Sequence, residues 1–418
     1  MARAPPPFRD LVAASFRVGC LGFGGPAGQI ALMHRVFVAE KQWIDEARYL
    51  HALNYCMLLP GPEAQQLATY VGWLLHGVRG GIVAGALFVL PGALVVLVLS
   101  WLYALFGETP TIAALFFGIK AAVLALVVEA MLKVARRSLE SRTDVAIASG
   151  TLLALYVFDV PFPLVIVLAA IAGLARGRGA GTPAPASVVV ATPGAMQALR
   201  VAVAWGVLWL APVALAWTLL GRHHVLTDIG LLFSKLAVVT FGGAYAVLAY
   251  LQQQAVEVHG WLTAAQMIDG LGLAETTPGP LILVNQFVGY VAAWQSGGNL
   301  RLALAGAAMA SWCTFAPSYL WIFAGAPFAE RLRTSRWAAG MLAAIGAAVL
   351  GVIGNLALRF GAHVLWGGPV TVADLARVDG LAATIAVAAA VALVVAKMNV
   401  VLVILACALA GWAGHALR

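Results

Sequence analysis

The chain has 418 residues, of which 62% are hydrophobic and only 10% are charged, and its formal net charge is +8. A soluble domain carries about 25% charged residues, so the composition excludes a soluble protein and indicates an all-α protein that crosses a membrane several times. The basic residues concentrate at the ends of apolar segments and form no solvated basic face, which excludes nucleic acid as a partner. The cysteines lie in or beside apolar runs without metal-ligand spacing.

Glycine and proline interrupt the apolar segments of the first half. A first candidate span, roughly 11–36, is broken by Gly22-Phe23-Gly24-Gly25-Pro26, and the apolar run 45–77 is broken at Pro60-Gly61-Pro62. A helix needs about 20 apolar residues to cross the hydrocarbon, so the two pieces of the second run form one discontinuous span or a re-entrant hairpin. The remaining apolar segments are two uninterrupted spans, near 81–106 and 112–134, and two short helices, 144–158 and 161–176.

The second half repeats this pattern after a linker. The stretch 177–193 is rich in Gly, Pro, Ala and Thr, and one further span, about 195–220, follows it. Six more apolar segments complete the chain: 229–251, 262–296 broken at Pro278-Gly279-Pro280, 300–327, 338–360, and the short pair 380–396 and 399–416. Counting each broken segment once gives about 13 transmembrane segments. The predicted units are a first repeat (1–176), a linker with one connecting helix (177–228), and a second repeat (229–418).

Three landmarks share one offset between the two halves. Phe241-Gly242-Gly243 repeats Phe23-Gly24-Gly25 (241 − 23 = 218), and Trp261 and Pro278-Gly279-Pro280 repeat Trp43 and Pro60-Gly61-Pro62 in the same register. With the N-terminus inside, most basic loops fall on the inner side, with Arg222 and Arg301 as exceptions. Six spans and one connecting span then place the second repeat upside down. Two inverted repeats with discontinuous helices are the architecture of a secondary transporter.

The breaks themselves predict an anion site. A helix that restarts after a break has backbone N–H groups without intrahelical partners at the positive end of its dipole, and glycine lets a ligand approach that backbone closely. The candidate substrate-binding residues are Phe23, Gly24, Gly25, Pro26, Pro60, Gly61, Pro62, Phe241, Gly242, Gly243, Pro278, Gly279 and Pro280, with the nearby amides Gln29, Gln65, Gln66, Asn285 and Gln286. Alternatively, the glycines and prolines only kink helices, and the amides join helices together.

Two cations align in the same register. Arg17 and Lys235 (235 − 17 = 218) each stand six residues ahead of a Phe-Gly-Gly sequence. Each repeat therefore offers a cation on the helix that precedes its break, and a dianion between the repeats would contact both. The alternative is that both side chains reach the lipid headgroups from helix ends.

Two carboxylates near the breaks are candidates for proton coupling, because ionisable groups within the membrane are costly. Glu63 follows the first Pro-Gly-Pro and Glu275 precedes the second, although Glu63 is also explained as a helix-dipole partner. Lys120 and Glu129 are interpreted as structural, with Glu129 and Lys133 as an i,i+4 pair.

The sequence has no nucleotide-binding loop, zinc motif or nucleophile elbow. It therefore predicts no catalytic residue, metal or cofactor, and transport driven by an ion gradient or the membrane potential.

The chain resembles the chromate ion transporter family in its long, two-domain form, over essentially its whole length. The resemblance lies in Phe23-Gly24-Gly25-Pro26, Trp43, Pro60-Gly61-Pro62 with Gln65 and Gln66, Phe241-Gly242-Gly243, Trp261, and Thr277-Pro278-Gly279-Pro280. It implies a multi-pass protein of the bacterial inner membrane that exports chromate, confers chromate resistance and is coupled to protons. The second repeat departs from the first by Ala244 in place of Pro26 and Leu281 in place of Glu63, which weakens a symmetric assignment of roles.

The partners expected from sequence are chromate or a similar oxyanion and the lipid bilayer, and a homodimer is left open. Chromate and sulfate have the same charge and nearly the same shape, so a carrier for sulfate or another oxyanion is the first alternative. The second alternative is a membrane-embedded enzyme or lipid-handling protein that uses Glu63 and Glu275 as acid and base.

Overall fold

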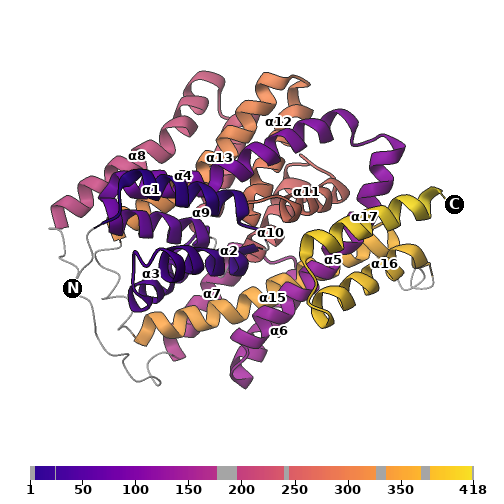
Figure 1. Ribbon diagram of the computed structural model, residues 1–418. Helices are drawn as coiled ribbons and strands as arrows, with labels where there is room; N and C mark the ends of the chain where they lie inside the picture. Colours follow the sequence, from indigo (N-terminus) through magenta and orange to yellow (C-terminus); the bar gives the residue numbers. More distant parts are fainter. Residues whose placement is uncertain are drawn as a thin grey trace.

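The computed structural model describes residues 5–23, 25–176, 195–239, 244–325, 336–368 and 377–416. Within these ranges every regular element is a helix, which confirms the predicted all-α fold (Figure 1). Four helices in the described part are long and apolar enough to cross a membrane: Glu63–Phe106, Pro110–Ser138, Met196–Leu220 and Gly340–Trp366. The protein is therefore an integral membrane protein, and the count of about 13 segments stays a prediction.

The helices of the two halves follow one another in corresponding order. The first half contains α1 (Phe8–Leu21), α2 (Gly25–His34), the π-helix η1 (Arg35–Glu40), α3 (Glu46–Leu58), α4 (Glu63–Phe106), α5 (Pro110–Ser138), α6 (Arg142–Tyr156) and α7 (Phe162–Arg176). Helix α8 (Ala195–Leu220) connects the halves. The second half contains α9 (Val225–Val239), α10 (Ala244–Gln252), η2 (Gln253–Val258), α11 (Ala264–Thr276), η3 (Leu281–Leu283), α12 (Val284–Gly297), α13 (Leu300–Gly325), α15 (Arg336–Trp366), α16 (Gly380–Ala390), η6 (Val391–Val395) and α17 (Val400–Ala416).

The offset of 218 relates η1 to η2 (35 + 218 = 253) and α3 to α11 (46 + 218 = 264). Both π-helices and both α-helices of these pairs also end in register, at 40 and 258 and at 58 and 276. The boundaries of the three predicted units and the inversion of the second repeat stay predictions.

The helices end where the sequence places its glycine and proline breaks. Gly25 (φ +69°) begins α2 after the break that follows α1, Gly61 (φ +109°) lies between α3 and α4, and Gly279 (φ +95°) follows α11. Glycine occupies these positive-φ positions because it lacks the Cβ that makes them costly. The predicted boundary between 77 and 81 is a kink inside α4, where His76 and Gly77 leave helical geometry.

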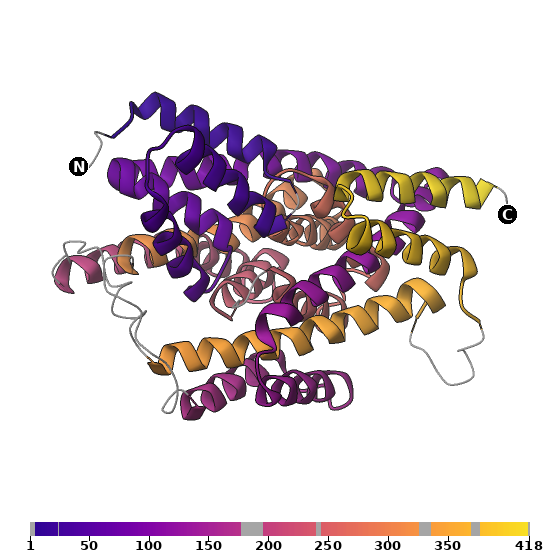
Figure 2. The same cartoon turned by 60° about the horizontal axis from the view of Figure 1, so that its bottom comes forward.

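The short helix pair of each half packs on the long helix of the other half. Helix α5 contacts α16 and α17, whereas α15 contacts α6 and α7 (Figures 1 and 2). A Cβ on Gly118 of α5 would lie 1.8 Å from the carbonyl oxygen of Cys407 in α17, and one on Gly173 of α7 would lie 2.4 Å from that of Gly340 in α15. Small residues let these backbones meet. Helices α5 and α15 are therefore each covered by a helix pair of the other half.

Candidate functional site

The broken segments of the two halves meet in the interior. The backbone N–H of Gly279, in the second Pro-Gly-Pro, donates to the carbonyl of Gly22 over 3.0 Å. The side-chain Nε2 of Gln29 lies 2.5 Å from the carbonyl oxygen of Gly279 and 3.2 Å from that of Gly22. Gln29 is fully buried. The break between α1 and α2 is thus joined to the Pro-Gly-Pro of the other half, and we call Gly22, Gln29 and Gly279 the break junction.

Each Pro-Gly-Pro also lies beside the residue that follows an internal proline of the other half. A Cβ on Gly92, directly after Pro91 in α4, would lie 2.1 Å from the carbonyl oxygen of Pro278. A Cβ on Gly61 would lie 3.7 Å from the hydroxyl of Ser318, directly after Pro317 in α13. Both Pro-Gly-Pro segments therefore lie beside a long helix of the other half, next to an internal proline that removes a backbone hydrogen bond, and the approach at Gly92 is the closer one.

Several of the predicted amides are buried around these breaks. Gln66 donates to the carbonyl of Pro60 (2.7 Å), Asn285 donates to the hydroxyl of Thr314 (3.0 Å), and Gln286 donates to the carbonyl of Ala93 (2.7 Å). Gln65 is fully buried and faces Thr69. The side-chain oxygens of Gln29, Gln65, Gln66 and Asn285 have no hydrogen-bond partner among the described residues. Buried polar atoms normally have one, so these amide oxygens have capacity for a hydrogen-bond donor, whereas the donors that an oxyanion needs are the side-chain N–H groups now bound to carbonyls and to Thr314.

The two candidate carboxylates differ in their surroundings. Glu275 is buried at the end of α11 and accepts a hydrogen bond of 2.5 Å from the hydroxyl of Tyr245 at the start of α10. Glu63 is the first residue of α4 and is half-buried. Glu275 therefore lies between the restart of one broken helix and the Pro-Gly-Pro of another, a contact that the sequence did not reveal.

A second buried carboxylate, Asp269, was missed from the sequence. It lies one and a half turns before Glu275 on α11, accepts a hydrogen bond from Tyr103 (2.8 Å) and lies 3.4 Å from Lys120. The signal was Lys120, because an amine inside a long apolar helix requires a partner. The predicted pair of Glu129 and Lys133 is confirmed, with 2.6 Å between oxygen and nitrogen.

The aligned cations lie at exposed positions. Arg17 is 52% exposed and forms an ion pair with Glu40 over 2.9 Å. Lys235 is exposed, and its nitrogen lies 5.4 Å from the ring centre of Tyr250. Within the described ranges, no hydrogen bond or ion pair joins either cation to the break junction. Their role in binding an anion stays a prediction.

Some of the predicted break residues lie outside the part of the chain that the structure describes. Gly24, Phe241, Gly242 and Gly243 lie outside the described residues. The side chain of Phe23 is exposed, whereas Pro26 and Pro62 are half-buried.

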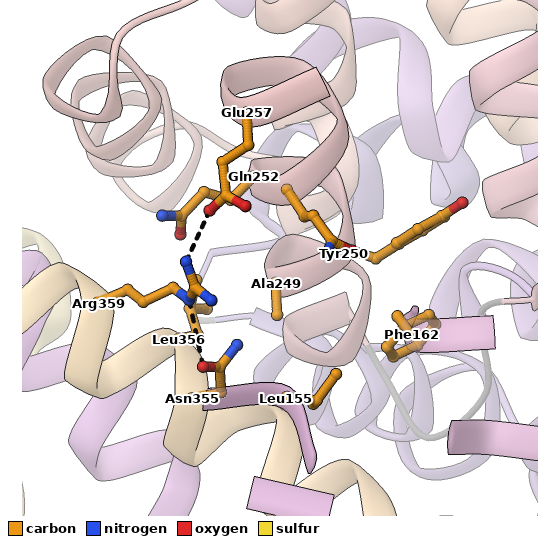
Figure 3. A pocket seen from close by; sticks show the side chains of 10 residues that line it. Leu155, Phe162, Ala249, Tyr250, Gln252, Glu257, Asn355, Leu356 and Arg359 are labelled. Atoms are coloured by element: carbon orange, nitrogen blue, oxygen red, sulfur yellow. Dashed lines mark hydrogen bonds and ion pairs between the residues drawn. The ribbon is translucent and has the colours of Figure 1, made fainter. Parts of the chain in front are cut away.

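Tyr250 also lines a small pocket between η2 and α15 (Figure 3). Arg359 reaches from α15 to the carboxylate of Glu257 (2.8 Å) and to the side-chain oxygen of Asn355 (3.3 Å). Its guanidinium also contacts Asp159, in the turn between α6 and α7, over 2.7 Å. This ion cluster connects three elements and is a structural brace.

The comparisons with known proteins cover both halves. A sequence model of the family described as "Chromate transporter" matches residues 9–174 and 227–412. A chromate transport protein of Pseudomonas aeruginosa is 34% identical, over 98% of this chain and 93% of its own length. A chromate transport protein of Cupriavidus metallidurans is 31% identical over 77% of this chain, and a probable one of Synechococcus elongatus is 27% identical, also over 77%. No solved structure matches the chain.

These relatives are all described as transport proteins. The alternative of a membrane-embedded enzyme is therefore wrong. With both halves matched by the family and one relative similar along almost the whole chain, the protein belongs to the chromate transporter family and is a transporter.

Proposed function

We propose that the protein is a secondary active transporter that exports chromate across the bacterial inner membrane, is coupled to an ion gradient and confers chromate resistance. The support for chromate is that the relatives in Pseudomonas aeruginosa and Cupriavidus metallidurans are described as chromate transport proteins. Coupling to a gradient is favoured because the sequence contains no nucleotide-binding loop.

The observation that carries the proposed substrate site is the break junction. There the backbone of Gly22 and Gly279 comes together across the two halves, with the amide of Gln29 between them. Amide and backbone donors in a water-poor site bind oxyanions by hydrogen bonds that are stronger than in water. If the halves move relative to each other during transport, the hydrogen bonds of this junction break. The backbone N–H of Gly279 and the side-chain amide of Gln29 can then donate to the substrate.

The candidate for coupling is Glu275. A buried carboxyl that binds and releases a proton couples that proton to any motion that changes its surroundings. Its partner Tyr245 belongs to α10 and Glu275 itself to α11, so movement between these helices alters the carboxyl environment. Glu63 keeps the same role as a second candidate.

Arg17 and Lys235 enter the proposal as cations that attract the dianion. This role predicts that Arg17→Ala and Lys235→Ala abolish chromate export, measured as uptake into everted vesicles, while the protein level is retained. Full activity in both variants would exclude the role, and Arg17 would then serve only its ion pair with Glu40. A homodimer stays a prediction, which the molar mass of the purified protein tests.

The test of the proposed function is transport by the purified protein in proteoliposomes. Chromate and sulfate uptake are compared with and without an imposed pH gradient, and protein-free liposomes provide the baseline. Chromate uptake that increases with the gradient supports the proposal. Sulfate uptake that chromate fails to inhibit favours the alternative of a sulfate carrier, and absence of uptake for both anions contradicts the proposal.

A further inference from the structure

A pocket of about 500 Å³ opens at one surface of the second half, away from the break junction. Four chain segments form it: the turn between α8 and α9, the turn between η2 and α11, the end of α12 and the start of α13. Figure 1 shows the end of α8 close to the turn between α12 and α13. The volume falls within the range of about 300–1,000 Å³ typical of small-ligand sites.

The lining of this pocket is rich in imidazoles. His223 and His224 come from the α8–α9 turn, and His259 comes from the η2–α11 turn, where its ring stacks on Trp261 with 4.3 Å between centres. Among the described residues, no group of three His, Cys, Asp or Glu side chains has a geometry that holds a metal ion. Nδ1 of His224 accepts a hydrogen bond from the backbone N–H of Leu226 over 3.2 Å, so the neutral ring carries its proton on Nε2, which is left to donate to an anion.

Two exposed arginines flank the pocket in sequence, and one carboxylate lines it. Arg222 and Arg301 are exposed, and each is adjacent in sequence to a lining residue, His223 and Leu302. These two arginines are also the exceptions to the predicted inner location of basic residues. The preference of basic residues for the inner side of the membrane therefore does not explain their positions. The opposing charges are Asp228, which lines the pocket, and Glu257, which is bound to Arg359.

Helix dipoles add to this positive field. Helices α9, α11 and α13 begin at Val225, Ala264 and Leu300, close in sequence to the lining residues Val225, Trp261 and Leu302. The N-terminus of a helix carries about half a positive charge, and several together raise the local concentration of anions. The C-terminus of α12 opposes them with one negative end.

We propose that this pocket is a vestibule that binds a small divalent oxyanion, such as sulfate or chromate, on the face of the protein opposite the start of α8. The ligand class rests on the proposed function. The vestibule concentrates the anion at the end of the transport path in the second half, and its affinity increases as the imidazole of His259 becomes protonated.

The expected pH dependence follows from His259. Burial lowers the pKa of His259, and the nearby Asp228 carboxylate partly offsets this shift. A histidine with a lowered pKa is neutral at pH 8 and gains charge only as the pH falls. Binding of a dianion is therefore stronger at pH 6 than at pH 8.

The experiment uses the full-length protein with Ser296→Cys, because Ser296 lines the pocket. The rate of labelling by an uncharged, membrane-impermeant maleimide is measured with increasing sulfate at constant ionic strength, with chloride as the reference salt. Sulfate replaces chromate as the probe because chromate oxidises thiols. The protein without the substitution gives the background from Cys20, which is half-buried.

We expect sulfate to slow the labelling, and to do so at lower concentration at pH 6. The double variant Arg222→Gln/Arg301→Gln should raise the sulfate concentration for half-protection about fivefold, as expected for two exposed charges. Arg142→Gln, at the exposed first residue of α6, is the matched control and should change nothing.

A labelling rate that sulfate leaves unchanged at both pH values, in protein that elutes as a folded species, overturns the vestibule. This failure is distinct from failure of the proposed function, because chromate uptake is measured separately. A protein that transports chromate without sulfate protection contradicts the vestibule alone. A protein that shows protection but transports no oxyanion contradicts the proposed function alone.

Discussion

The side-chain nitrogen of Gln29 lies 2.5 Å from the carbonyl oxygen of Gly279, although the two residues are 250 positions apart. The same nitrogen lies 3.2 Å from the carbonyl oxygen of Gly22, so one amide connects the break of the first half to the Pro-Gly-Pro of the second. Because both residues belong to broken segments, this contact ties the two halves together at the point where their helices are interrupted.

Gln29→Leu should destabilise the protein measurably. Leucine has a similar size but donates no hydrogen bond, and the loss leaves the carbonyl of Gly279 without this donor in a buried site. Removing one partner of a buried hydrogen bond costs about 1–3 kcal/mol. Thermal unfolding in detergent measures the effect, and Gln197→Leu, at an exposed position of α8, is the control. Equal unfolding temperatures for both variants would show that the contact contributes nothing.

Gly92→Ala should separate α4 from the second Pro-Gly-Pro. The new Cβ would lie 2.1 Å from the carbonyl oxygen of Pro278, so the backbone has to move. Forcing an extra methyl group into a packed site costs about 1–3 kcal/mol, and we expect chromate transport to fall at least as steeply as stability.

The matched control is Gly150→Ala, because a Cβ at Gly150 in α6 meets nothing within 4 Å. Alanine in a helix is more favourable than glycine by about 1 kcal/mol, so this variant should be neutral or slightly more stable. Normal transport by Gly92→Ala would contradict the close approach of Pro278.

Glu275→Gln should uncouple transport from the pH gradient. Glutamine preserves the size of the side chain and accepts the hydrogen bond from Tyr245, but it binds no proton in the physiological range. We expect gradient-driven chromate uptake to fall at least about tenfold, the effect of losing a coupling free energy of about 1.4 kcal/mol, while exchange of chromate across the membrane continues.

The control for this variant is Glu140→Gln, at an exposed position between α5 and α6. An unchanged response of Glu275→Gln to the gradient would remove Glu275 from the coupling mechanism and leave Glu63 as the remaining predicted carboxyl.

Neither half should fold alone. Helix α5 packs on α16 and α17, and α15 packs on α6 and α7, so each isolated half exposes surfaces that only the other half covers. Two fragments separated within 177–194 should copurify when expressed together, and each should aggregate or be degraded when expressed alone. A monodisperse, helical single fragment would show that the exchange of helix pairs is dispensable for folding.

The sequence predicted the helical fold and the positions of its interruptions, because glycine and proline act locally on the backbone. Pro60-Gly61-Pro62 and Pro278-Gly279-Pro280 both separate helices, with glycine at positive φ in each. The membrane location also followed from composition alone, because a chain with few charges and long apolar segments is stable only in a lipid bilayer.

Contacts between distant segments did not follow from the sequence. The pairing of Gly22 with Gly279 and of Lys120 with Asp269 depends on how the helices pack, and no local spacing encodes it. Equal offsets suggested equal roles for Arg17 and Lys235, but one contacts Glu40 and the other Tyr250. Repeat symmetry in sequence therefore does not extend to the partners of each side chain.

The central claim is that chromate passes through the break junction, and chromate counterflow in proteoliposomes tests it most directly. Liposomes loaded with unlabelled chromate contain the wild type, Gln29→Leu or Gln197→Leu, and the initial uptake of labelled chromate is measured without any ion gradient. We predict that Gln29→Leu, in a preparation that elutes as folded protein, loses at least about 90% of the flux, corresponding to about 1.4 kcal/mol in the barrier, whereas Gln197→Leu retains it. Equal counterflow by all three proteins would contradict the account.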